Sequence, residues 1–142
     1  MPKKFIKILF YAYLLILTWG ILFKFATQPR FMVFFMNTRF VNLIPFAEPL
    51  VIDGRIVWEE LAFNLVSFLP YGMLLPMVKP SRSVGAVIVS GFTLSVTYEF
   101  LQYLLAIGMA DVTDILMNTL GTCCGLLLYR SSVSKQLSAP YR

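Results

Sequence analysis

The stretch VGAVIVSGFTLSVTYEFLQYLLAI, residues 84–107, carries a single charged side chain, that of Glu99. A transmembrane helix needs about 20 consecutive, mostly apolar residues, so this stretch is long enough to cross a bilayer. Over the whole chain of 142 residues, 58% are hydrophobic and 13% are charged, whereas soluble domains carry about 25% charged residues. This composition cannot cover a water-facing surface, and it predicts one membrane domain over residues 1–142.

Three further apolar stretches cover residues 5–23, 59–78 and 111–129. The first is too long for the apolar region of a signal peptide and no A-x-A-like site follows it, so a retained helix is predicted. The connections at residues 79–83 and 108–110 are so short that the helices they join must be antiparallel neighbours. The sequence therefore predicts an all-α, polytopic membrane bundle of about four transmembrane helices.

Basic residues are distributed unevenly between the two ends of this bundle. Cytoplasmic loops of membrane proteins carry an excess of Lys and Arg. With a cytoplasmic N-terminus the inner side holds Lys3, Lys4, Lys7, Lys79, Arg82, Arg130, Lys135 and Arg142, and the outer side holds Lys24, Arg30, Arg39 and Arg55. Both termini are therefore predicted to be cytoplasmic. The net charge of +5 reflects this orientation and not nucleic-acid binding, because the basic residues are sparse and flank apolar runs.

Residues 24–58 form one long outer connection that is unusually rich in phenylalanine between residues 31 and 46. Aromatic residues mixed with Arg and Asn suit the headgroup zone or a shallow re-entrant excursion, and the sequence leaves both open. Further on, Asp53-Gly54 lies between two apolar triplets, a pattern typical of a β-hairpin. A hairpin this short is marginal on its own.

Each of the last three helices carries one polar stripe, because residues three and four positions apart share a helix face. The stripes are Glu60, Asn64, Ser67 and Tyr71; Ser95, Glu99 and Gln102; and Asp111, Asp114, Asn118, Gly121 and Gly125. A charge that faces lipid costs at least about 2.5 kcal/mol. The stripes are therefore expected to face one another, or a water-filled recess, in the outer half of the bilayer.

Glu99 is the most informative of these residues, because a neutral side chain would be much less costly there. Hydrogen bonding between helices accounts for the Ser and Asn residues of the stripes, but carboxylates repel one another unless they are protonated or paired. A functional polar site is therefore favoured over packing alone, with Arg39 expected as the basic partner. Gly121 and Gly125 form a GxxxG pattern, which predicts close packing against another helix.

Some chemistry is excluded by composition. The chain has no histidine, so it cannot use a Ser-His-Asp or Cys-His nucleophile system or His-ligated zinc. Its two cysteines, Cys123 and Cys124, are adjacent in an apolar run and are expected to be small packing residues. No cofactor is predicted, although a divalent cation at Asp111 and Asp114 is one alternative.

These residues, in this order, resemble the VanZ-like family of bacterial membrane proteins. The resemblance covers about residues 39–129. It is carried by Asn42, Leu43, Ile44, Pro45 and Phe46, by Asn64, Phe68, Pro70, Gly72 and Pro76, by Ser95, Glu99 and Gln102, and by Asp111, Asp114, Asn118, Thr119, Gly121 and Gly125. It implies a multi-pass protein of the bacterial cytoplasmic membrane linked to resistance to teicoplanin, a lipid-tailed glycopeptide. Relatives often carry a basic residue just before the first Asp of the last helix; residues 108–110 lack one, which argues against an Arg-clamped anion site there.

Three hypotheses for function follow. The first is an outer-leaflet pocket that binds or handles a lipid-linked envelope precursor, a membrane lipid or a lipoglycopeptide, lined by Asn42, Asn64, Glu99, Gln102, Asp111, Asp114 and Asn118. In it Pro45, Phe46, Pro70, Gly72, Gly121 and Gly125 are structural. The second is an intramembrane enzyme in which Glu99 is a general acid or base, while Asp111 and Asp114 hold a cation against a lipid phosphate. The third is an accessory subunit for another membrane protein.

Overall fold

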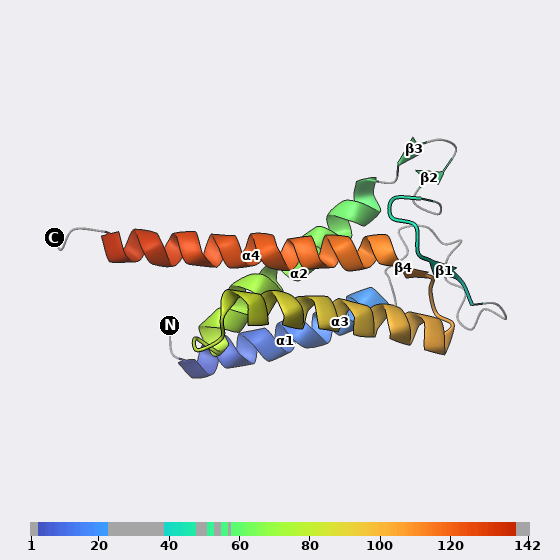
Figure 1. Cartoon of the computed structure of the whole chain (residues 1–142). Coiled ribbons are helices and arrows are strands. Elements are labelled where there is room, and N and C mark those ends of the chain that lie inside the picture. The colour runs from blue at the N-terminus through green and yellow to red at the C-terminus, as the bar shows by residue number, and fades with distance from the viewer. Residues whose placement is uncertain (1–2, 23–38, 48–50, 53–54, 57, 139–142) are drawn as a thin grey trace.

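The computed structural model describes residues 3–22, 39–47, 51–52, 55–56 and 58–138. Its four helices are α1 (Lys3–Leu22), α2 (Trp58–Val78), α3 (Val84–Leu105) and α4 (Val112–Ser138). Each is long and apolar enough to cross a membrane. The predicted all-α, four-helix membrane bundle is thus confirmed (Figure 1).

Local chemistry explains where α3 begins and ends. The Ser83 hydroxyl caps the start by accepting a hydrogen bond from the Ala86 amide at 3.2 Å, which satisfies one of the free N–H groups of the first turn. At the other end Ala106 adopts a left-handed conformation with φ of 51°, and this stops the helix two residues before the predicted boundary.

The fourth helix is longer than predicted. It was expected to end at residue 129, but α4 continues to Ser138. The expectation was wrong because it equated the end of the apolar run with the end of the helix. Arg130 and the Ser and Lys residues that follow it are polar, but residues of these types can continue a helix.

Glycine positions let α2 and α4 approach each other very closely. A methyl group added to Gly121 would overlap the Leu65 carbonyl, one on Gly125 would overlap the Leu69 carbonyl, and one on Gly72 would overlap the Thr122 carbonyl. The two backbones are therefore in direct contact, the arrangement that small residues permit in membranes.

Helix α1 packs on the remaining helices through two apolar clusters. One contains Phe10, Tyr71, Leu75, Val87 and Leu126, and the other contains Leu17, Ile21, Phe68 and Tyr98. Large apolar side chains also cover the outside, with Leu15 74% and Leu127 66% exposed. This outer surface suits contact with lipid.

Two short strand pairs lie at one end of the bundle, opposite the start of α1 and the end of α4 (Figure 1). Strand β1 (Val41–Asn42) pairs in parallel with β4 (Ala110–Asp111), so Asn42 lies beside Asp111. Strands β2 (Val51–Ile52) and β3 (Arg55–Ile56) form an antiparallel hairpin. The expected hairpin is present, although Asp53 and Gly54 lie outside the described residues, as does the first half of the phenylalanine-rich segment, residues 31–38.

Candidate functional site

The polar stripes of α2, α3 and α4 turn toward one another inside the bundle. Six of the seven proposed ligand-binding side chains are buried, with exposed fractions of 7% or less: Asn64, Glu99, Gln102, Asp111, Asp114 and Asn118. The seventh, Asn42, is half-buried on β1. We call these seven residues, together with Ser95 and Thr113, the polar cluster.

Asp111 links several elements of the structure within the polar cluster. One oxygen of its carboxylate accepts from the Asn42 amide at 3.0 Å, and the other accepts from the backbone N–H of Thr113 at 2.7 Å. Its own N–H donates to Glu99 Oε2 at 2.9 Å. Asp111 thereby caps the start of α4 and joins β1, α3 and α4 in one network.

Two amide side chains connect the helices deeper in the bundle. The Asn64 amide on α2 donates to the Asp114 carboxylate on α4 at 2.5 Å. The Asn118 amide on α4 lies 2.9 Å from the Ser95 hydroxyl on α3. These contacts bring together residues of three helices that are 50 and 23 positions apart in the sequence.

Gln102 extends the polar cluster to α1. Its amide nitrogen donates to the backbone carbonyl of Ile21 at 2.9 Å. Because that carbonyl can only accept, the orientation of the Gln102 amide is fixed. Its carbonyl oxygen Oε1 is fully buried, and within the described part of the chain it has no hydrogen-bond partner.

Arg39 does not pair with the carboxylates among the residues that the structure describes, which corrects the expectation. Its guanidinium donates to the carbonyls of Tyr103 at 3.1 Å and Leu104 at 3.4 Å, and it lies 5.9 Å from the centre of the Tyr103 ring. Carbonyls at the C-terminal end of a helix attract cations. The sequence could not reveal that the end of α3 competes for this side chain.

Two buried threonines were missed by the sequence analysis. The Thr113 hydroxyl accepts from the Phe46 amide at 3.0 Å and so attaches the segment after β1 to α4. Phe46 itself is half exposed and has φ of 58°, and Pro45 is also exposed.

The second of these threonines is Thr122, whose hydroxyl donates to the Asn118 carbonyl at 3.1 Å. Thr122 lies four residues after Asn118, so the spacing of the stripe could have identified it; nothing in the sequence marks Thr113.

The geometry gives little support to the metal-dependent alternative. No group of three or more His, Cys, Asp or Glu side chains suited to a metal ion occurs in the described ranges. Both oxygens of Asp111 already accept hydrogen bonds from protein groups. The arrangement is that of a hydrogen-bonded network between helices.

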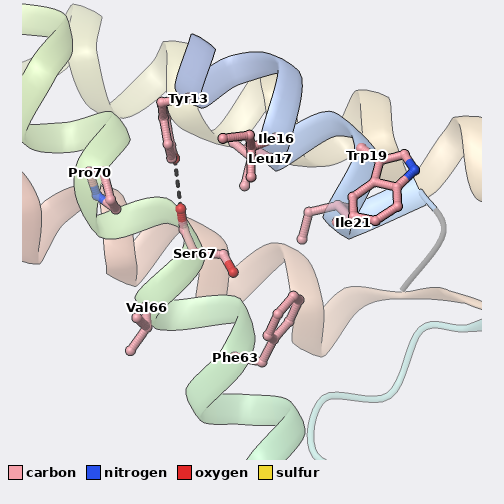
Figure 2. Close-up of a pocket in the computed structure, with 10 residues that line it drawn as sticks. Tyr13, Ile16, Leu17, Trp19, Ile21, Phe63, Val66, Ser67 and Pro70 are labelled. Atoms are coloured by element: carbon pink, nitrogen blue, oxygen red, sulfur yellow. Dashed lines mark hydrogen bonds between the residues drawn. The ribbon is translucent and has the colours of Figure 1, made fainter. Parts of the chain in front are cut away.

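An apolar groove of about 250 Å³ lies on the outside of the bundle between α1 and α2 (Figure 2). It is lined by Tyr13, Ile16, Leu17, Trp19, Gly20, Ile21, Phe63, Val66, Ser67 and Pro70. None of the seven proposed ligand-binding residues lines this groove. The polar cluster and the groove are therefore two distinct features.

Four membrane-spanning helices joined by a buried polar cluster define a multi-pass integral membrane protein. Comparison with known families then makes the assignment specific. The family model described as VanZ/LLP1 matches residues 10–134, and the chain belongs to this family. It is similar to "Protein VanZ" of Enterococcus faecium, with 35% identity over 119 residues that cover 82% of this chain and 68% of that protein. No solved structure matches the chain.

Proposed function

We propose that this VanZ-like protein uses its polar cluster to bind or handle the polar head of a membrane amphiphile and so contributes to resistance to teicoplanin-type glycopeptides. The amphiphile is a lipid-linked envelope component or the lipoglycopeptide itself. The observation that carries the proposal is the burial of Glu99, Asp111 and Asp114 together inside a membrane-spanning bundle.

Stability alone is a poor explanation for three buried carboxyl groups. Placing a carboxylate at bilayer depth costs at least about 2.5 kcal/mol, while a hydrogen bond between membrane helices contributes only about 0.6 kcal/mol on average. The Asn64–Asp114 hydrogen bond alone does not offset a cost of that size. Ionisable residues at such positions generally mark substrate or ion sites.

The route to the polar cluster runs through β1. Asn42 is half-buried and binds Asp111, so it is the member of the cluster nearest to the surrounding medium. The residues beside it are apolar and exposed, including Leu43 at 75% and Ile44 at 68%. A segment with this composition suits the boundary between headgroups and acyl chains, where the head of an amphiphile would arrive.

The charge pattern supports an external position for this end of the bundle. The start of α1, the α2–α3 turn and the end of α4 lie together at the opposite end (Figure 1), and they carry the basic residues Lys3, Lys4, Lys79, Arg82 and Arg130. Under the positive-inside rule that end is cytoplasmic. The polar cluster then lies in the outer leaflet of the bacterial cytoplasmic membrane, where envelope precursors and glycopeptides meet.

The test is drug susceptibility in a sensitive bacterial host that expresses the chain. Expression is expected to raise the inhibitory concentration of teicoplanin more than that of a glycopeptide without a lipid tail. Glu99→Gln and Asp114→Asn are expected to remove this protection, because each keeps an oxygen acceptor at its position but loses the charge. Leu104→Ala is the matched control, since Leu104 is 51% exposed on α3 and contacts lipid.

Equal protection against tailed and untailed drugs would contradict the role of the tail. Full protection in both charge-neutralised variants, at equal protein levels in the membrane, would remove the polar cluster from the mechanism.

A further inference from the structure

The floor of the groove between α1 and α2 is buried, whereas its two walls are exposed. Its floor is formed by Leu17 and Ile21, which are 5% and 1% exposed. Its walls include Ile16 at 69% and Val66 at 61% exposed. The groove therefore opens sideways toward the bilayer while its base is part of the packed bundle.

Gly20 leaves space in this groove. A methyl group added to Gly20 would meet only the tip of Phe63, at 4.0 Å, so glycine leaves space on this face of α1. At the inner end, the Tyr13 hydroxyl donates to the Ser67 carbonyl at 2.6 Å and holds the two helices together (Figure 2). That hydrogen bond also satisfies polar atoms that would otherwise face hydrocarbon.

The length of the groove matches one leaflet. From Tyr13 to Ile21 it runs about 12 Å along α1, at 1.5 Å per residue. Half of the hydrocarbon core of a bilayer is about 15 Å thick. Because α1 ends at Leu22, the groove begins at the end of the helix and extends inward to about the middle of the membrane.

The outer end of the groove meets the polar cluster. The backbone carbonyl of Ile21, in the groove floor, is the acceptor for the buried amide of Gln102. On the opposite wall Phe63 directly precedes Asn64, which binds Asp114. The apolar groove is about as long as one leaflet is thick and ends beside the polar cluster. This arrangement suits the tail and the head of an amphiphile.

We propose that the groove between α1 and α2 binds one acyl chain of a membrane lipid, as the tail subsite next to the polar cluster. This inference rests on the proposed function, because the polar cluster would take the head of the same molecule. The groove's apolar lining and its volume of about 250 Å³ suit a segment of one extended chain.

The test uses the purified full chain in vesicles of phosphatidylethanolamine and phosphatidylglycerol. These contain a trace of phosphatidylcholine with a photoreactive diazirine in one acyl chain. After illumination, labelled peptides are mapped by mass spectrometry. Labelling is expected to concentrate on residues 13–21 and 63–70, with little on the equally exposed Leu127 of α4.

Two glycine variants make the test specific. Gly20→Leu fills the groove and is expected to reduce its labelling several-fold. Gly85→Leu adds the same side chain at a site with nothing within 4 Å, and it is expected to label like the wild type. Ile16→Trp, which narrows the groove from its exposed wall, gives a second obstruction should Gly20→Leu fail to fold.

Labelling that spreads evenly over all lipid-facing helices, or that persists in the folded obstructed variants, overturns the proposal. Failure of the proposed function looks different. In that case the wild-type chain gives no protection against teicoplanin. The labelling pattern does not depend on that result, because it is measured on the purified chain without any drug.

Discussion

Replacing Gly125 with alanine tests the close contact between α2 and α4. The added methyl group would overlap the Leu69 carbonyl oxygen and lie 2.9 Å from its carbonyl carbon and 3.1 Å from the Met73 nitrogen. Carbon atoms normally pack at about 3.5–4.0 Å. All of these atoms belong to the backbone of α2, so no change of rotamer relieves the overlap and the helices must separate.

The size of the effect follows from two opposing terms. Overpacking a well-packed interior costs about 1–3 kcal/mol, and the Gly125 site belongs at the upper end because backbone meets backbone. Alanine recovers about 0.5–1 kcal/mol through its better helix propensity. A net loss of about 2 kcal/mol is therefore expected in the free energy of unfolding.

The assay is equilibrium unfolding in mixed micelles, followed by far-ultraviolet circular dichroism as the fraction of denaturing detergent rises. The matched control is Gly85→Ala, because a methyl group at Gly85 meets nothing within 4 Å, and this variant is expected to be as stable as the wild type or slightly more so. Unfolding of Gly125→Ala at the same detergent fraction as Gly85→Ala would refute the reasoning.

The same unfolding assay checks three further changes. Asn64→Leu removes the amide that donates to the buried Asp114 carboxylate and is expected to cost about 1–3 kcal/mol; a variant as stable as the wild type would show that the contact contributes nothing. Tyr13→Phe deletes the hydrogen bond to the Ser67 carbonyl, with an expected loss of about 0.5–1.5 kcal/mol, and an unchanged midpoint would contradict it. Arg39→Gln weakens the interaction with the end of α3 and is expected to lower the free energy of unfolding by less than about 1 kcal/mol. This loss is expected to shrink at high salt. A loss that does not depend on salt would contradict an electrostatic origin.

The helices could be predicted from the sequence because the bilayer imposes their length and their composition. The starts of α2 and α3 lie within one residue of the predicted boundaries. The inward direction of the polar stripes followed from the cost of placing Glu99 or Asp114 in lipid. Both predictions depend only on the local sequence and on the apolar interior of the bilayer.

The partners within the polar cluster could not be predicted, because hydropathy carries no information about contacts between distant residues. Spacing placed Asn64 and Asp114 on inward faces but did not show that they bind each other. The parallel pairing of Val41–Asn42 with Ala110–Asp111 is two residues long, too short to leave a periodic pattern. The groove was missed for a related reason, since it arises from how α1 and α2 lean against each other.

The length of α4 has a consequence on the side of the chain termini. Its 27 residues span about 40 Å, whereas the hydrocarbon core is about 30 Å thick. Arg130 is costly to place in hydrocarbon, and the last eight residues of the helix, from Ser131 to Ser138, extend about 12 Å beyond it. A protein fused after Ser138 would therefore be separated from Arg130 by about two turns of helix.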